Sequence, residues 1–192
     1  MTYDIILCGV GGQGVLSIAT VIASAAMRDG FHVRQSEVHG MSQRGGAVQA
    51  HMRIADSPIS SDLVPSGGAD MVLSMEPVEG LRYLSWLKPD GILVSAAEAF
   101  VNIPNYPELE TIHAAIRALS RSLLVAAEDL AKTAGNSKAV NMVLVGAALP
   151  FLPVKAETVA AAVSDIFGRK DTALVEINMK ALEMGRAAGH NS

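Results

Sequence analysis

The sequence predicts a Rossmann-like, doubly wound α/β fold, in which a mostly parallel sheet carries helices on both faces and the C-terminal third is helical. Short aliphatic runs at residues 5–7, 70–75 and 91–96 have the length of buried strands, and helical patterns lie between and after them. Beyond residue 137, apolar residues recur at helical spacing. With 192 residues, half of them hydrophobic, we expect one domain over residues 1–192.

The first unit of this fold is a strand, a glycine turn and a helix. Residues 5–7 form the strand, residues 9–14 read Gly-Val-Gly-Gly-Gln-Gly, and residues 15–27 are apolar and free of proline. The glycines fit G-x-G-x-x-G, which permits a tight turn and the close approach of a phosphate to backbone N–H groups. The helix start that follows suits an anion because its first N–H groups are unpaired. The alternative is a sterically required turn without a ligand.

A donor-rich loop follows the second predicted strand, residues 31–36. Glu37 lies 23 residues after Gly14, near the spacing at which dinucleotide-binding folds place their ribose-binding acid. The next nine residues add an imidazole, a hydroxyl, a guanidinium and three glycines. Such loops beyond strand ends are common binding surfaces. The candidate residues are Glu37, His39, Ser42, Arg44, Gly45 and Gly46.

The remaining elements are expected in the following order. A half-buried strand at 47–54 is followed by a loop at 56–68, within which residues 59–60 could form a short edge strand. The strand at 70–75 leads into a helix from Pro77 to about Leu87. A turn at 88–91, the strand at 91–96 and an irregular segment at 97–106 come next. Helices follow at 108–119, 128–134, 137–149, 157–167 and 171–188, with a strand at 122–126.

Three polar residues on these elements leave two interpretations open. Glu76 follows a strand at the expected ligand crevice, yet it also suits the first turn of a helix as a dipole-favoured acid. Asn141 and Asn178 fall on inward helix faces, where a buried amide needs partners. We expect these amides to hold a neighbouring loop rather than a ligand, and we keep Asn141 as a further possible contact.

Several function classes are disfavoured by what the chain lacks. Val15 and Leu16 stand where a P-loop needs Lys and Ser/Thr, and no G-x-S-x-G elbow exists. Cys8 is the single cysteine and suits a buried strand end, and the five histidines show no metal-ligand spacing, so we expect no metal. A net charge of −4 disfavours broad nucleic-acid binding. Because glycines interrupt the uncharged residues 5–27, we expect a cytoplasmic protein without a membrane span.

Two segments together resemble a known family. Residues 9–15 and residues 36–46, the second reading Ser-Glu-Val-His-Gly-Met-Ser-Gln-Arg-Gly-Gly, closely resemble the small, gamma-type subunit of 2-oxoacid:ferredoxin oxidoreductases, above all those that act on indolepyruvate. Further similarity at residues 70–77, 87–91 and 136–146 and around Asn178 extends it over essentially the whole chain.

The resemblance implies a role in a larger complex. Such a complex converts an aryl 2-oxoacid and coenzyme A into an acyl-CoA and CO2 while it reduces ferredoxin. The family's large subunit holds thiamine diphosphate and iron–sulfur clusters. This chain has one cysteine and no thiamine motif, which agrees with a need for that partner. The resemblance supplies no catalytic residue for this chain.

The resulting hypothesis concerns binding. The amides of Gly11, Gly12 and Gly14, with the Gln13 side chain, would cradle an anionic group, and we expect this group to belong to coenzyme A. Arg44 would pair with phosphate or carboxylate, and Ser42 and His39 would add hydrogen bonds. Docking against the large subunit is an alternative use of the same loop. The rival functions are a stand-alone NAD- or FAD-dependent dehydrogenase and a non-catalytic ligand-binding domain.

Overall fold

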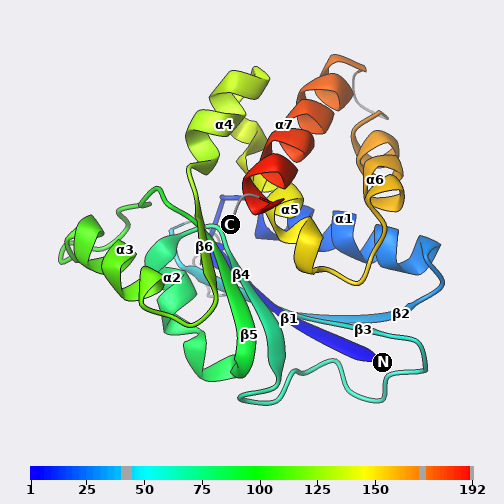
Figure 1. Cartoon of the computed structure of the whole chain (residues 1–192), viewed down its shortest axis with the longest axis horizontal. Helices are drawn as coiled ribbons and strands as arrows, with labels where there is room; N and C mark the ends of the chain where they lie inside the picture. Colours follow the sequence, from blue (N-terminus) through cyan, green and yellow to red (C-terminus); the bar gives the residue numbers. More distant parts are fainter. Residues whose placement is uncertain (40–44, 169–171, 191–192) are drawn as a thin grey trace.

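The computed structural model describes residues 1–39, 45–168 and 172–190, and its centre is a six-stranded sheet with the order β2-β3-β1-β4-β5-β6 (Figure 1). The strands are β1 (Thr2–Val10), β2 (His32–His39), β3 (Ala47–Ala55), β4 (Ala69–Ser74), β5 (Leu87–Ala96) and β6 (Ser122–Val125). β1, β4, β5 and β6 pair in parallel, whereas β3 is antiparallel to both β1 and β2. The prediction of a mostly parallel sheet is confirmed.

Helices cover both faces of the sheet (Figure 1). One face carries α2 (Pro77–Arg82) and α3 (Leu109–Arg117), and the other carries α1 (Val15–Arg28), α4 (Ala127–Ala134), α5 (Val140–Ala148), α6 (Ala156–Gly168) and α7 (Thr172–His190). Three short 3₁₀ turns are η1 (Leu84–Trp86), η2 (Ser137–Ala139) and η3 (Leu149–Phe151). None of the helices in the described ranges combines the length and apolar character that a membrane crossing requires.

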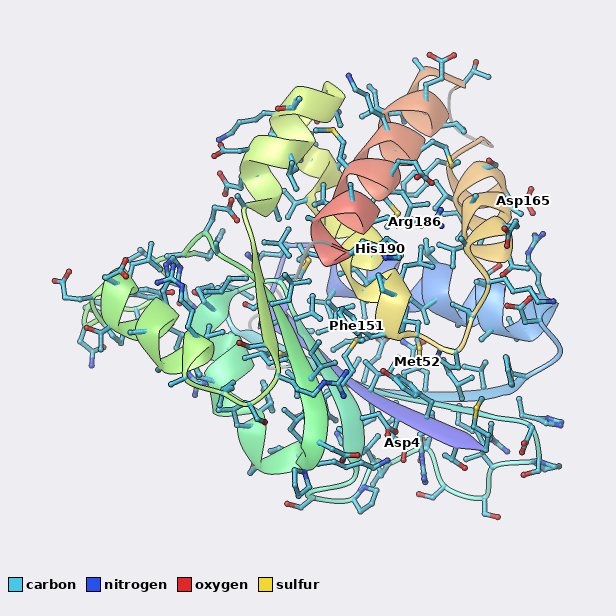
Figure 2. The ribbon with its side chains drawn as sticks, in the orientation of Figure 1. Asp4, Met52, Phe151, Asp165, Arg186 and His190 are labelled. Carbon is cyan, nitrogen blue, oxygen red and sulfur yellow. The ribbon has the colours of Figure 1, made fainter. Side chains whose placement is uncertain are left out.

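The sheet separates two hydrophobic cores, and β1 contributes to both because successive side chains of a strand point to opposite faces. Ile5 and Leu7 pack beneath the larger helical layer, whereas Ile6 and Cys8 pack beneath α2 and α3. All four side chains are fully buried. Met52 of β3 belongs to the core beneath the larger layer (Figure 2). The burial of Cys8 confirms the structural role predicted for it, and burial raises the pKa of its thiol to about 12.

Three local expectations were wrong. The helix from Pro77 ends at Arg82 and continues only as η1, because the chain must turn there for Leu87 to pair with Ala69 of β4. The turn expected at 88–91 is instead a bulge within β5. Between two successive paired positions, β4 advances by two residues, from Ala69 to Met71, whereas β5 advances by five. Residues 59–60 form no strand.

The helical layer depends on a very close contact between α5 and α7. A Cβ atom on Gly146 would lie 2.0 Å from the carbonyl oxygen of Leu182, and one on Gly185 would lie 1.9 Å from that of Val143. Glycine at both positions therefore lets the two backbones touch. Asn178, also on α7, is buried and donates from Nδ2 to the carbonyl oxygen of Leu174 at 2.7 Å. This hydrogen bond is thus within its own helix and not to the neighbouring loop that we expected.

Polar contacts of different burial join α1 to α6. Asp29, at the end of α1, accepts hydrogen bonds from the backbone N–H of Lys155 at 2.8 Å and from Thr158 Oγ1 at 3.0 Å. The Asp29 side chain is only 4% exposed. Arg28 forms an ion pair with Asp165, which Figure 2 shows on α6, but both of these side chains are largely exposed.

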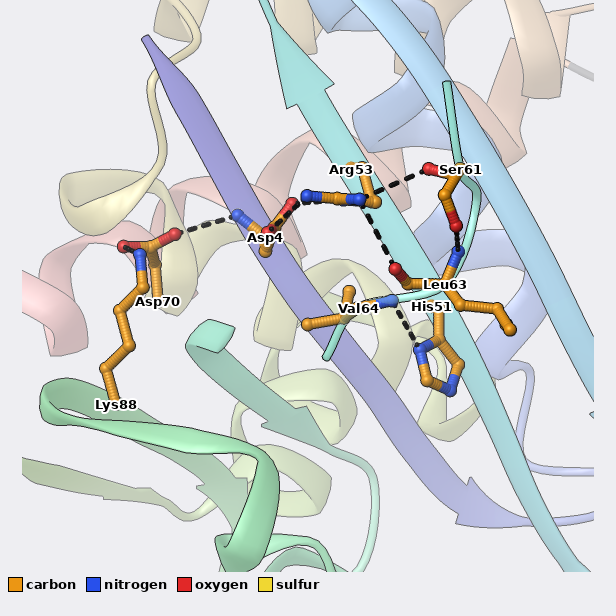
Figure 3. A network of polar contacts seen from close by, with 8 residues as sticks. All are labelled: Asp4, His51, Arg53, Ser61, Leu63, Val64, Asp70 and Lys88. Atoms are coloured by element: carbon orange, nitrogen blue, oxygen red, sulfur yellow. Dashed lines mark hydrogen bonds and ion pairs between the residues drawn. The ribbon is translucent and has the colours of Figure 1, made fainter. Parts of the chain in front are cut away.

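A polar network ties the loop at 56–68 to the sheet (Figure 3). Asp4 accepts hydrogen bonds from Arg53 Nε at 2.9 Å and Nη2 at 3.1 Å, and Arg53 Nη1 donates to the carbonyl oxygens of Ser61 and Leu63. The neighbouring His51 accepts at Nδ1 from the backbone N–H of Val64 at 3.0 Å. These bonds hold the loop by its backbone, which explains its order without secondary structure.

Candidate functional site

A cleft of about 610 Å³ lies at the carboxyl ends of β1, β4 and β5. The chain leaves β1 through α1 on one face of the sheet and leaves β4 through α2 on the other, so the topology switches between these two strands. In open α/β sheets, ligands bind at such a switch point. The cleft is lined by Gly11, Gly12, Gln13, Gly14, Gly45, Met75, Ala96, Glu98, Ala99, Phe100, Glu128, Ser137, Lys138, Val140 and Asn141.

The glycine turn forms one wall of this cleft and opens onto the first turn of α1. Gly12 and Gly14 have φ angles of +103° and +94°, a left-handed conformation that favours glycine. Gly14 occupies the N-cap position, where no side chain caps the helix, and the first turn of α1 holds no acid. Within the described residues, no acceptor is found for the amide N–H groups of Gly12 and Gly14. These donors can therefore receive an anion.

Gln13 holds the turn rather than presenting its amide freely. Its Oε1 accepts from the backbone N–H of Val10 at 2.7 Å, and its Nε2 donates to the carbonyl oxygen of Met75 at 3.2 Å. The backbone N–H of Gln13 also donates to the Val10 carbonyl at 3.1 Å. The side chain thus fixes the end of β1 against the end of β4, beside the cleft.

The backbone of Gly11 is engaged as well. Its N–H donates to the carbonyl oxygen of Gly46 at 2.8 Å, and its carbonyl accepts from Gly45 N at 3.2 Å. The two bonds continue the β1–β3 ladder past Val10, so the Gly11 amide, which we expected to cradle an anion, is occupied by the protein. Asn102 Nδ2 donates to the Gly45 carbonyl at 3.0 Å and links this corner to the segment after β5.

Glu98, which also lines the cleft, caps α4. Its two carboxylate oxygens accept from the backbone N–H groups of Glu128 at 3.0 Å and Ala127 at 3.2 Å. Burial raises the pKa of the Glu98 carboxyl, whereas these backbone hydrogen bonds act in the other direction. The start of α4 is therefore already satisfied by a carboxylate, in contrast to that of α1.

Two further residues complete the cleft. Asn141, predicted as a further contact, lines it beside Gly14; a Cβ on Gly14 would lie 3.4 Å from Asn141 Nδ2. Lys138 also lines it and was missed by the sequence reasoning, as were Glu98 and Phe100. The sequence signal for Lys138 was its position three residues before Asn141, at the start of the same helical segment.

Glu76 lies at the end of β4 but does not line the cleft. It is 1% exposed, accepts from the backbone N–H of Glu79 at 2.8 Å as the N-cap of α2, and accepts a hydrogen bond from Tyr106. Of the two interpretations left open for Glu76, the helix cap fits this geometry. Glu79 is also buried, and burial raises the pKa of its carboxyl although Arg82 Nε lies 3.2 Å away.

Glu37 is not brought to the glycine turn, because β3 lies between β1 and β2. Glu37 pairs with Ala50 of β3, is exposed, accepts from Gln35 Nε2 at 2.6 Å and is not among the cleft residues. Neighbouring strands are about 4.8 Å apart, so Glu37 is displaced from the position of a ribose-binding acid by one whole strand. Ser42, Arg44 and the His39 side chain lie outside the described residues.

Comparisons with known proteins place this fold and cleft in a family context. The chain is 37% identical over 194 residues to the indolepyruvate oxidoreductase subunit IorB of Archaeoglobus fulgidus, covering 96% of this chain and 94% of the relative. The subunit of the same name from Pyrococcus horikoshii is 39% identical over 95% of this chain and 94% of its own length.

A solved structure agrees with this similarity. The gamma subunit of a keto/oxoacid ferredoxin oxidoreductase from Geobacter sulfurreducens superposes with a TM-score of 0.74 at 26% identity, over 99% of both chains. The family model described as pyruvate ferredoxin/flavodoxin oxidoreductase matches residues 4–188. The chain therefore belongs to the pyruvate ferredoxin/flavodoxin oxidoreductase family.

Proposed function

We propose that this chain is the small subunit of an oxidoreductase that acts on an aryl 2-oxoacid such as indolepyruvate. The observation that carries the proposal is the near full-length similarity, at 37–39% identity, to subunits named for indolepyruvate. The reaction would join the acyl group to coenzyme A, release CO2 and pass the electrons to ferredoxin.

The catalytic cofactors are proposed to reside in a partner subunit. The sequence has one cysteine, and in the structure Cys8 is buried with a raised pKa, which does not suit a cluster ligand. In the described part of the chain, no group of His, Cys, Asp or Glu side chains is placed to hold a metal ion. A large subunit with thiamine diphosphate and iron–sulfur clusters would supply this chemistry.

The contribution proposed for this chain is to bind coenzyme A in the cleft. The open amides of Gly12 and Gly14 support an anionic ligand, with Arg44 and Ser42 as further contacts from the adjoining loop. A solved 2-oxoglutarate:ferredoxin oxidoreductase from Magnetococcus marinus with coenzyme A bound shares the fold, with a TM-score of 0.80 at 19% identity. The structure favours this ligand over a dinucleotide because Glu37 lies away from the cleft.

The first experiment is anaerobic co-purification with this chain, followed by an assay with indolepyruvate, coenzyme A and a low-potential acceptor. We expect a brown partner of larger mass and activity that requires coenzyme A. A colourless chain that purifies alone and is inactive would refute the proposal. Tight binding of NADH by the isolated chain would instead favour the dehydrogenase.

The role of the cleft is tested by Gly12→Ala and Arg44→Ala in the assembled complex. Each should raise the KM for coenzyme A about tenfold, the loss of roughly 1.4 kcal/mol of binding free energy. Gly30→Ala is the matched control, because Gly30 also has a positive φ, +86°, and open space at the Cβ position, but lies at the far end of α1. Unchanged KM values in both cleft variants would refute coenzyme A binding at this site.

A further inference from the structure

A second cavity, of about 310 Å³, lies at the amino ends of the parallel strands, at the other end of the sheet from the cleft. Ligand cavities in proteins measure roughly 300–1,000 Å³, so this one suits a small molecule. The residues around it that carry the argument below come from β1, β4, β5, the start of β6 and η3, and they are Tyr3, Asp70, Asp90, Arg121, Pro150 and Phe151. None of these six lines the cleft.

Two hydrogen-bond donors of this cavity have capacity to spare. Arg121 donates from Nη1 to the carbonyl oxygen of Asp90 at 2.7 Å, and among the described residues no carboxylate forms an ion pair with its guanidinium. The half-buried Tyr3 hydroxyl likewise finds no acceptor in the described part of the chain, although tyrosine hydroxyls inside proteins usually have one. A guanidinium beside a hydroxyl is suited to bind a carboxylate.

The Tyr3 hydroxyl is held in its donor form. Burial raises the pKa of Tyr3, and the negative charge of Asp70 raises it further, whereas the positive charge of Arg121 acts in the other direction. Both charges therefore lie near the hydroxyl. Because it stays protonated at neutral pH, it can donate its proton to a ligand oxygen.

The cavity also carries an unpaired negative charge. In the described ranges the Asp90 carboxylate has no ion-pair partner, although the carbonyl of the same residue holds Arg121. The other acid is already neutralised, because Asp70 lies 2.5 Å from Lys88 Nζ and accepts from the Asp4 N–H at 2.8 Å (Figure 3). One free cation and one free anion thus lie close together, which suits a neutral zwitterion.

The third part of the cavity is apolar. Pro150 and Phe151 belong to η3, which follows α5 directly, and Phe151 packs partly against the core beneath the larger helical layer (Figure 2). The remaining surface of these two side chains faces the cavity. Aromatic rings pack well against such surfaces, edge to face or offset.

We propose that this cavity binds a free α-amino acid with an aromatic side chain. Arg121 and the Tyr3 hydroxyl take its carboxylate, and the Asp90 carboxylate takes its ammonium group. The aromatic ring lies against Pro150 and Phe151. The site goes beyond the proposed function and does not depend on it, because it lies at the end of the sheet away from the cleft and shares no residue with it.

The test is isothermal titration calorimetry of the full chain with L-phenylalanine, L-tyrosine and L-tryptophan in turn. At least one of them should bind, and Arg121→Gln should weaken that binding about tenfold, or about 1.4 kcal/mol. Tyr3→Phe, which removes the hydroxyl alone, should weaken it about threefold. Arg117→Gln is the matched control, because Arg117 is also exposed but pairs with Glu110 on α3 and does not line the cavity.

The recognition of the ammonium group is tested separately with 3-phenylpropanoate, which has the carboxylate and the ring of phenylalanine but no nitrogen. Asp90→Asn should weaken the binding of the amino acid about tenfold and leave 3-phenylpropanoate binding unchanged or tighter. Arg121→Gln should weaken both ligands alike. Thermal unfolding of each variant checks that the fold is retained.

If none of the three amino acids binds at concentrations up to about 10 mM, the inference is overturned. Equal dissociation constants in Arg121→Gln and Arg117→Gln would overturn it too, since the ligand would then bind elsewhere. Amino-acid binding that Asp90→Asn leaves unchanged would show that no ammonium group is recognised, which contradicts the ligand class. Calorimetry requires no turnover, so the result stands apart from the success or failure of the proposed function.

Discussion

Gln13 donates a hydrogen bond from Nε2 to the carbonyl oxygen of Met75 at 3.2 Å, and this contact joins the glycine turn after β1 to the end of β4. The same amide accepts from the Val10 N–H at 2.7 Å. One side chain therefore holds the two strands on either side of the topological switch. Because the cleft opens between them, the shape of the anion site depends on this amide.

Replacing Gln13 with Ala should lower the free energy of unfolding by about 1–3 kcal/mol, since it leaves the Val10 N–H and Met75 carbonyl without this partner. Urea denaturation of the purified chain measures the loss. Gln35→Ala is the control, because the Gln35 side chain donates its hydrogen bond to the exposed Glu37 side chain rather than to the backbone, and it should change stability by less than about 0.5 kcal/mol. Equal effects of the two substitutions would contradict the structural role given to Gln13.

Gly185→Ala should destabilise the chain by about 3 kcal/mol or more, because the added Cβ would lie 1.9 Å from the Val143 carbonyl oxygen and force α5 and α7 apart. Thermal unfolding followed by circular dichroism measures the effect. Gly168→Ala, near the end of α6, offers the comparison: its Cβ would meet Val175 Cγ2 at an ordinary 3.6 Å. That variant should be neutral or slightly more stable, since alanine favours helix. A Gly185→Ala protein of unchanged stability would show that the two helices are not in backbone contact.

Stability should fall as the pH drops below about 6.5, in part because of His51. Burial lowers the pKa of His51 in the folded chain, and its Nδ1 accepts a hydrogen bond from Val64 that a proton would abolish. The unfolded chain then binds more protons than the folded one between the two pKa values, so stability rises with pH across that range and is complete above it.

His51→Gln should reduce this slope when the free energy of unfolding is measured by denaturant at a series of pH values from 5 to 8. His32→Gln, at an exposed position of β2, should leave it as in wild type. A His51→Gln protein with the full wild-type pH dependence would assign the effect to other groups.

Asp29→Ala should cost about 1–2 kcal/mol of stability, because the buried carboxylate caps the start of α6 through Lys155 N and Thr158 Oγ1. Asp165→Ala removes an ion pair between α1 and α6 whose side chains are both exposed, and it should have a much smaller effect. Chemical denaturation of the two variants side by side gives the difference. The order would be reversed if the exposed pair, rather than the cap, held the helices together.

Local patterns in the sequence identified most elements but not their neighbours in space. The glycine turn and α1 follow from glycine spacing and an uninterrupted apolar run, and Gly135 ends α4 with a φ of +118°, as expected for a helix-terminating glycine. The sequence pattern of β3 does not predict that this strand lies between β1 and β2, because a strand with alternating apolar and polar residues pairs equally well with several partners. The placement of Glu37 failed for that reason.

The cleft was only partly foreseen, for a similar reason. Gly11, Gly12, Gln13, Gly14, Gly45 and Asn141 were proposed and do line it. Glu98 and Lys138 were missed because neither belongs to a motif, and each reaches the cleft only through the packing of α4 and η2 beyond the ends of β1 and β5. The engagement of the Gly11 amide was missed because it depends on a backbone bond to Gly46, which is distant in sequence.

The helical layer over α1 is built from the last part of the chain, and this order matters during synthesis. β1 and α1 leave the ribosome before α5 and α6, yet α1 packs against both of these later helices, which end near residue 168. Until those residues emerge, the side of α1 that packs against α5 and α6 has no native cover. Nascent chains in this state expose aggregation-prone surface, and the isolated N-terminal half should therefore require a chaperone to stay in solution.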